Sequence, residues 1–144
     1  MTVQRFSDRA IDVASEIAKP SNANLTLLHV IDPIEDPDSM IIGNNKELIE
    51  RARLMNIGKQ TVNGWNERAK EKIEKLNEQK IKSGSECLIG PAAEKILEYA
   101  DAKKADMIVM GSSNRFRGIL KIKALGSVTR KVSELANCPV LIVH

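Results

Sequence analysis

The arrangement of apolar positions predicts a helix, a strand and a loop in the first part of the chain. Apolar residues recur at helical spacing from residue 10 to residue 17, and this helix is expected to begin at Ser7 and end at Pro20. Residues 24–31 form a short apolar run with β-branched members, which predicts a buried parallel strand. Residues 32–45 contain two prolines and a glycine and are predicted to form a loop.

A long polar helix and three short strands are predicted for the rest of the chain. One apolar stripe runs through residues 46–82, and Gly58 and Gly64 are expected to divide this helix into pieces. The stripe consists of Val62, Trp65, Ala69, Ile73 and Leu76. The length of the region leaves a role in binding a partner helix open. The predicted strands are residues 86–89, 107–110 and 140–143, with one helix starting at Pro91 and another over residues 126–135.

This alternation of strands and helices predicts an α/β fold. We expect a Rossmann-like, open, mostly parallel sheet with helices on both faces, formed by a single domain over residues 1–144. In such sheets, ligands bind beyond the carboxyl ends of the strands. A site is therefore expected among the loops that follow Ile31, Ile89 and Met110.

The composition narrows the class of protein. Hydrophobic residues make up 42% of the 144 residues and aromatic residues only 3%, so the core is expected to be aliphatic. No apolar run approaches the roughly 18 residues of a membrane span, and Cys87 and Cys138 show no disulfide framework. We therefore expect a cytoplasmic protein with no membrane partner. The net charge of +3 is too small by itself to indicate nucleic acid.

The connection between Gly111 and Ser127 carries the strongest indication of a binding site. It is longer than the roughly 2–6 residues usual between a strand and a helix, and residues 107–133 contain no Asp or Glu. Gly111 permits close approach of the backbone, and Gly126 opens a helix whose free N–H groups favour an anion. Further phosphate donors in this segment are Ser113, Arg115 and Arg117. A solvated basic loop with turn-forming glycines explains the same residues equally well, and the ending of a Walker A loop is absent.

Several blocks of sequence, taken in order, resemble the universal stress protein family over roughly residues 7–143. The clearest blocks are Met107-Ile-Val-Met-Gly-Ser-Ser113, Leu125-Gly-Ser-Val128 and Cys138-Pro-Val-Leu-Ile-Val143, and residues 7–10, 25–32 and 90–97 agree with them. The match is loosest between residues 33 and 84. The resemblance implies the fold of that family, which is also the fold of adenine nucleotide α-hydrolases. It further implies ATP or a related adenine nucleotide as ligand, with Mg²⁺ as a companion.

The resemblance also implies particular contacts. ATP-binding members carry Gly, two residues, Gly, nine residues and then Gly-Ser or Gly-Thr around the ribose and phosphates. Gly111 matches the first glycine, and Gly126 with Ser127 matches the last pair. The main chain of Val30 would border the adenine, and Met110 would lie beneath the nucleotide. The implied nucleotide-binding residues are Val30, Met110, Gly111, Ser113, Asn114, Gly126, Ser127 and Val128.

Two features depart from the family pattern. Asn114 stands at the second glycine, where Asn still tolerates a positive φ, and the stretch to Gly126 is two residues longer than in the family. The family also begins with a strand ending in an Asp-Gly-Ser-like turn, whereas residues 1–6 contain no aspartate. The first strand is therefore expected to be missing or truncated: the chain start lies too late, the sheet closes without it, or a partner supplies it. We expect an unusual N-terminal edge and weakened or absent ATP binding.

Other reactive residues have simpler explanations. An acid–base pair of His29 and Asp32 is conceivable, but a partly buried histidine at a strand end is favoured. Cys87 and Cys138 are expected in the core, and no ligand-spaced cluster indicates zinc. The chain-terminal His144 is expected to be frayed.

The loops hold two further candidates. The acidic residues Glu35, Asp36 and Asp38 are explained more simply by solvation than by Mg²⁺, so no metal is assigned. Phe116 lies between two arginines and is open to stacking on a base or to acting as a hydrophobic latch. Trp65 is expected to pack rather than to stack on a base.

The resulting hypotheses differ in what the site does. The leading one is a stress-response protein in which a bound adenine nucleotide acts as a regulatory switch. The alternative is a homodimeric interaction module of the same family that binds no nucleotide, and the resemblance implies pairing through Val140, Leu141, Ile142 and Val143. A dedicated enzyme is not expected, and weak ATP hydrolysis ranks third because no base for water can be named. Nucleic acid binding rests on the charge bias alone and is not favoured.

Overall fold

A parallel sheet of five strands, in the order β3-β2-β1-β4-β5, runs through the molecule. The computed structural model describes residues 2–4, 8–32, 47–112 and 125–144. The strands are β1 (Thr2–Gln4), β2 (Leu25–Ile31), β3 (Ser83–Ile89), β4 (Ile108–Gly111) and β5 (Val140–Val143). The helices are α1 (Asp8–Ser21), α2 (Glu47–Glu78), α3 (Ala92–Ala102) and α4 (Ser127–Leu135). The predicted α/β architecture with a parallel sheet is therefore confirmed.

The first strand is truncated but present, in the middle of the sheet. Thr2–Gln4 pairs with β2 on one side and with β4 on the other, and Val3 lies opposite both Leu27 and Val109. The expectation of a sheet that closes without this strand, or with an unusual edge, is wrong. Three residues suffice because each is paired on both sides, which satisfies backbone groups that would otherwise be buried without partners.

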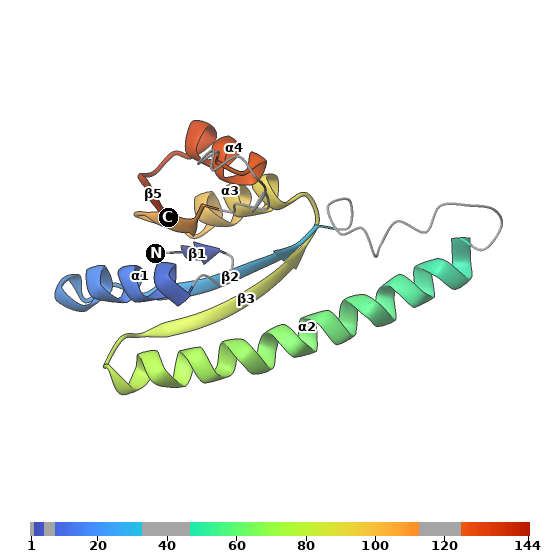
Figure 1. Ribbon diagram of the computed structural model, residues 1–144, viewed down its shortest axis with the longest axis horizontal. Helices are drawn as coiled ribbons and strands as arrows, with labels where there is room; N and C mark the ends of the chain where they lie inside the picture. Colours follow the sequence, from blue (N-terminus) through green and yellow to red (C-terminus); the bar gives the residue numbers. More distant parts are fainter. Residues whose placement is uncertain (1, 5–7, 33–46, 113–124) are drawn as a thin grey trace, which may run out of the picture.

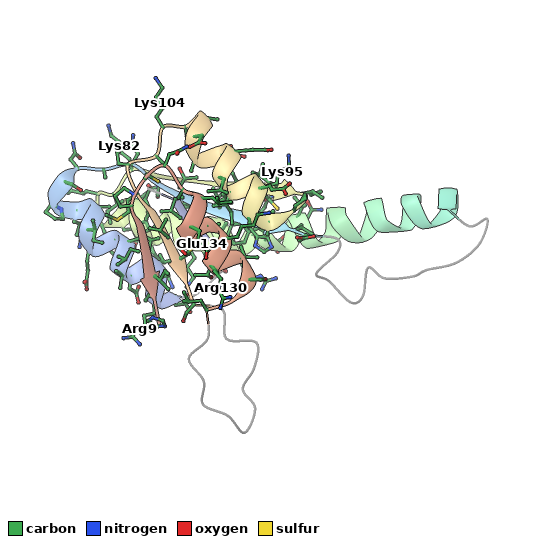
Figure 2. All side chains as sticks on the ribbon, turned by 90° about the horizontal axis from the view of Figure 1, so that it is seen from above. Arg9, Lys82, Lys95, Lys104, Arg130 and Glu134 are labelled. Atoms are coloured by element: carbon green, nitrogen blue, oxygen red, sulfur yellow. The ribbon has the colours of Figure 1, made fainter. Side chains whose placement is uncertain are left out.

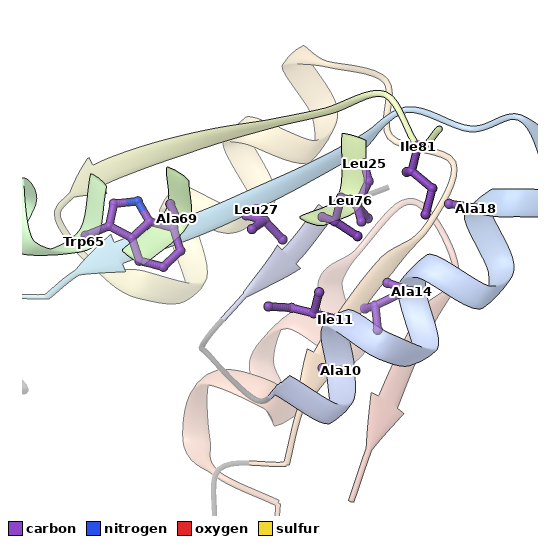
Figure 3. Close-up of a cluster of buried hydrophobic side chains, with 11 residues drawn as sticks. Ala10, Ile11, Ala14, Ala18, Leu25, Leu27, Trp65, Ala69, Leu76 and Ile81 are labelled. Carbon is purple, nitrogen blue, oxygen red and sulfur yellow. The ribbon is translucent and has the colours of Figure 1, made fainter. Parts of the chain in front are cut away.

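The helices cover the two faces of the sheet. Figure 1 shows α1 and α2 on one face and α3 and α4 on the other. The α1 and α2 face buries Trp65, Ala69 and Leu76 of the predicted stripe against β2 and α1, as Figure 3 shows for this cluster. The other face buries Ile96 of α3 and Val132 of α4 against the same sheet. Both cores are mainly aliphatic, as the composition predicts.

Several predicted boundaries are wrong by a few residues, each for a local reason. α2 is one continuous helix, because a glycine within a helix costs only about 1 kcal/mol, and the packed stripe outweighs that cost. α1 includes Pro20 and ends where Asn22 adopts a φ of 52°. Pro91 is the N-cap of α3 rather than its first helical residue. In the described part of the chain, no helix is long and apolar enough to cross a membrane.

A proline in the central strand tests how far the sheet depends on β1. Val3→Pro should lower the free energy of unfolding by about 1–3 kcal/mol, because it removes a backbone donor and leaves a buried acceptor on the neighbouring strand without its partner. Ser83→Pro is the matched control, since Ser83 opens β3 at the edge of the sheet and should tolerate proline far better. Urea denaturation followed by Trp65 fluorescence gives both values, and similar losses would contradict the central role of β1.

Candidate functional site

The candidate site lies at the carboxyl edge of the sheet. There, main-chain groups of β2 and β4 point toward the axis of β1, the strand between them. Leu25 N–H donates to the Lys82 carbonyl and Gly90 N–H donates to the Ile31 carbonyl, so the odd residues of β2 face β3. Val30 therefore turns its N–H and C=O toward β1, because successive residues of a parallel strand alternate between neighbours.

The same alternation applies to β4. Ile108 and Ser112 donate their N–H groups to β5 or to the residue before it, so Gly111 faces the opposite way, toward β1. The register ends at Gln4, opposite Leu28 and Met110, so Val30 and Gly111 lie beyond the last described residue of β1. Val30 and Gly111, two predicted site residues far apart in sequence, thus both point main-chain N–H and C=O groups toward the axis of β1.

An apolar layer lies directly beneath this edge. Val30 is 8% exposed and Met110 is 2% exposed, and both side chains belong to the cluster on the α3 and α4 face. Val128 is partly buried against the same cluster. The structure therefore brings Val30, Met110, Gly111 and Val128 together around one end of the sheet.

The N-terminus of α4 borders the edge, and no side chain among the described residues caps it. Gly126 is its N-cap in an extended conformation, with φ −61° and ψ 156°, and the first turn contains no acidic residue. Ser127 is exposed at the first helical position, and Arg130 N–H donates to the Gly126 carbonyl as the helix begins. Uncapped N–H groups and the helix dipole favour an anion at such an end.

One side-chain hydrogen bond joins α4 to the end of β4. The Thr129 hydroxyl Oγ1 donates to the Gly111 carbonyl at 3.3 Å, and Thr129 is 2% exposed. Sequence reasoning missed this residue. The signal was a hydroxyl residue three positions after Gly126, which places it in the first turn of the predicted helix and within reach of the preceding strand.

The N-terminus of the neighbouring helix α3 is capped by a protein carboxylate. Asp32 Oδ2 accepts the N–H of Ala92, the first residue of α3, at 3.1 Å, whereas the N-cap Pro91 makes no side-chain cap. Gly90, between β3 and α3, has a φ of 144°, a conformation that favours glycine. Asp32 therefore stabilises the positive end of α3, and sequence reasoning did not assign it this capping role.

His29 is not part of an acid–base pair with Asp32. Its ring stacks on Trp65 with the centroids 4.8 Å apart, which places it on the α2 face of the sheet. Asp32 instead caps a helix on the opposite face. The favoured interpretation of His29 as a partly buried strand histidine agrees with this contact.

Neither cysteine has the character of an activated thiol. Cys87 and Cys138 are free and partly buried. Burial raises the pKa of both thiols, and the carboxylate of Asp101 raises that of Cys138 further. Among the described residues, no group of three or more His, Cys, Asp or Glu side chains is arranged to hold a metal ion.

Two arginines add positive charge to the edge. Figure 2 shows Arg9 of α1 and Arg130 of α4 on the side of the molecule opposite Lys82 and Lys104. Both arginines are exposed, and neither forms an ion pair with another described residue. They were not predicted as site residues, although each lies near the start of a helix that follows a strand of the sheet.

The remaining predicted contacts fall outside the described residues. This applies to Ser113, Asn114, Arg115 and Arg117, and to Glu35, Asp36, Asp38 and Phe116.

Comparisons with known proteins identify relatives over nearly the whole chain. The sequence model of the universal stress protein family matches residues 4–144. The chain is 37% identical over 144 aligned positions to universal stress protein YxiE of Bacillus subtilis, which covers 96% of this chain and 91% of that protein. The fold is similar to that of universal stress protein UspA from Lactobacillus plantarum, with a TM-score of 0.71, 22% identity and coverage of 100% and 97% of the two chains. A universal stress protein in complex with cAMP gives a TM-score of 0.62 at 25% identity, with the same coverage of 100% and 97%.

The cap on α3 makes a prediction about stability. Asp32→Ala should lower the free energy of unfolding by about 0.5–2 kcal/mol, because the first N–H of α3 loses its acceptor, while Asp32→Asn retains an oxygen and should lose less. Glu94→Ala is the control, since it removes an exposed first-turn carboxylate paired with Lys131 and should change stability by about 0.5 kcal/mol or less. Equal losses for the two alanine variants in urea denaturation would contradict the capping role.

Proposed function

The chain belongs to the universal stress protein family, and we propose that it is a stress-response protein that binds ATP or a related adenine nucleotide at the carboxyl edge of its sheet. The structural neighbour in complex with cAMP supports an adenine nucleotide as the class of ligand. The proposed unit is one domain over residues 1–144, acting in the cytoplasm, where its two free cysteines would stay reduced.

One observation carries the proposal: the uncapped start of α4 is held against the end of β4 beside the main chain of Val30. An anionic group placed at Gly126 and Ser127 would accept the first N–H groups of α4. A base lying toward β2 would meet the main-chain groups of Val30 over the apolar layer formed by Met110. This orientation matches a nucleotide, which has a flat base at one end and phosphates at the other.

The charges at the edge support the same orientation. α3 already has the Asp32 carboxylate at its N-terminus, so phosphate would be repelled there and attracted to α4. Ser113, Asn114, Arg115 and Arg117 remain predicted contacts by resemblance. The described residues form no metal cluster, so any Mg²⁺ would arrive on the phosphate oxygens.

We assign the nucleotide a regulatory role rather than a catalytic one. Its phosphates would lie between β4 and α4, so binding would bias the segment that connects these two elements and change the surface it presents. Among the described residues, His29 faces α2 and Asp32 caps α3, so neither is placed to activate water at α4. Slow hydrolysis would therefore be a side activity.

Gly126 offers a test that separates binding from folding. Gly126→Asp should keep or raise stability, because Gly126 has the extended conformation of an N-cap and Asp is favoured there. The same carboxylate would occupy the proposed phosphate position, so ATP affinity should fall at least about tenfold. Isothermal titration with ATP, AMP and cAMP measures the affinities, and thermal unfolding measures the stability.

Gly126→Asn provides the matched control, since it adds a similar capping group without charge. It should retain most of the affinity that Gly126→Asp loses. Absence of binding heat from the unmodified protein with all three nucleotides would overturn the proposed function. An ATP affinity of Gly126→Asp equal to that of the unmodified protein would remove α4 from the site.

The second candidate function is a homodimeric interaction module, favoured by the position of β5. This strand lies at an edge of the sheet, and Val140–Val143 are four apolar residues that are all only partly buried. Pro139 and Val143 direct their carbonyls to β4, so Val140 and Ile142 turn their backbone groups away from the sheet. A second copy pairing along this edge would satisfy those groups.

A proline at Ile142 tests this pairing. Ile142→Pro should convert a dimer into a monomer with little loss of stability, because it removes a donor that faces away from β4. Leu141→Pro should instead destabilise the fold, because Leu141 faces β4. Sedimentation velocity gives the assembly state, and a monomeric unmodified protein at high concentration would contradict the second function.

A further inference from the structure

Thr129 is a buried hydroxyl residue at the junction of the sheet with α4. It is the third residue of α4, and it is 2% exposed beside Val132 in the cluster on that face. Its hydroxyl donates to the Gly111 carbonyl at 3.3 Å, across 18 positions of sequence. Among the residues that the structure describes, it is the one side-chain hydrogen bond between β4 and α4.

The carbonyl that Thr129 engages has a defined direction. Gly111 turns its carbonyl toward the line of β1, beyond Gln4, which is where Val30 also turns its main-chain groups. A carbonyl oxygen without a donor would present negative partial charge to that region and oppose an anion. The hydroxyl proton of Thr129 offsets this charge and fixes the first turn of α4 relative to the strand end.

The geometry points to Thr129 as a positioning residue for the phosphate half of the ligand, an inference that rests on the proposed function. Thr129 touches the Gly111 carbonyl rather than the nucleotide. It holds the first N–H groups of α4 close to the end of β4. It also donates to the Gly111 carbonyl, whose negative partial charge would otherwise oppose a phosphate. Its effect should therefore appear in the affinity for phosphate-bearing ligands and be nearly absent for adenosine.

The decisive comparison uses ATP and adenosine. Thr129→Val keeps the branched shape and removes the hydroxyl, and it should weaken ATP about threefold to tenfold, the range expected for one hydrogen bond. Adenosine affinity should change less than about twofold, within the scatter of mutants that do not touch the ligand. Thr129→Ser restores the hydroxyl and should recover most of the ATP affinity.

Ser15→Ala is the matched control for a general loss of stability. The Ser15 hydroxyl donates to the Asp12 carbonyl at 2.7 Å within α1, and Ser15 is 9% exposed. This variant also removes a largely buried hydroxyl bonded to a carbonyl, but on the face away from α4. Its affinities for ATP and adenosine should equal those of the unmodified protein.

Amide hydrogen exchange in the ligand-free protein keeps the inference separate from the proposed function. Thr129→Val should speed exchange of the Arg130 amide, which donates to the Gly126 carbonyl as α4 begins, whereas Ser15→Ala should not. Unchanged exchange and unchanged ATP affinity in Thr129→Val would overturn the inference, as would equal losses for ATP and adenosine. An unmodified protein that binds neither ligand would overturn the phosphate role together with the proposed function, while faster exchange would still identify Thr129 as the residue that holds α4.

Discussion

Backbone pairing on both sides of β1 is the constraint on which the rest of the structure depends. Three residues join the β2 and β3 half of the sheet to the β4 and β5 half, with Val3 opposite Leu27 and Val109. The described pairing of β1 ends at Gln4, opposite Leu28 and Met110, while β2 continues to Ile31 and β4 to Gly111. Val30 and Gly111, which follow those partners, both turn main-chain groups toward the axis of β1.

Alternation along β2 sends neighbouring side chains to opposite faces of the sheet and neighbouring main-chain groups to opposite strands. The side chains of Leu27 and His29 face the α2 side, where Trp65 packs, and those of Leu28 and Val30 face α3 and α4. The main chain alternates as well, and Val30 is the residue near the edge that faces β1. Both faces of β2 are buried against helices, which explains why the apolar run is nearly continuous on this strand.

The sequence allowed the fold to be predicted where a pattern was long or where both faces of a strand were buried. The stripe through Trp65 and the run over residues 24–31 gave the right elements because burial determines both. β3 was predicted too short because its start, Ser83-Gly-Ser, is polar, and only pairing with β2 makes it a strand. β1 was expected to be missing or truncated because residues 1–6 are too short for the family's first strand and its Asp-Gly-Ser-like turn and contain no aspartate, whereas pairing on two sides stabilises even a short strand.

For the site, the sequence indicated where strands end and helices begin, but it did not reveal the side-chain contacts between elements. The glycines Gly111 and Gly126 were identified because a strand end and a helix start are visible in sequence. The bonds made by Thr129 and Asp32 span 18 and 60 positions, and only the order of the strands brings their partners together. Asp32 was considered beside His29, its neighbour in sequence, and the sheet instead places the two on opposite faces.

The bonds of Asp32 and Thr129 make the starts of α3 and α4, the two helices on one face of the sheet, electrostatically different. α3 and α4 both begin at the carboxyl edge, and both would attract negative charge through their dipoles. The carboxylate of Asp32, which directly follows β2, caps the start of α3, while the Thr129 hydroxyl donates to the Gly111 carbonyl and no described side chain caps the start of α4. An anion that approaches this edge is therefore repelled at one helix and attracted at the other. The polarity of the proposed site follows from the Asp32 carboxylate at the start of α3 and from the first turn of α4, which contains no acidic residue, and this polarity would orient the proposed nucleotide with its base toward β2 and its phosphates toward α4.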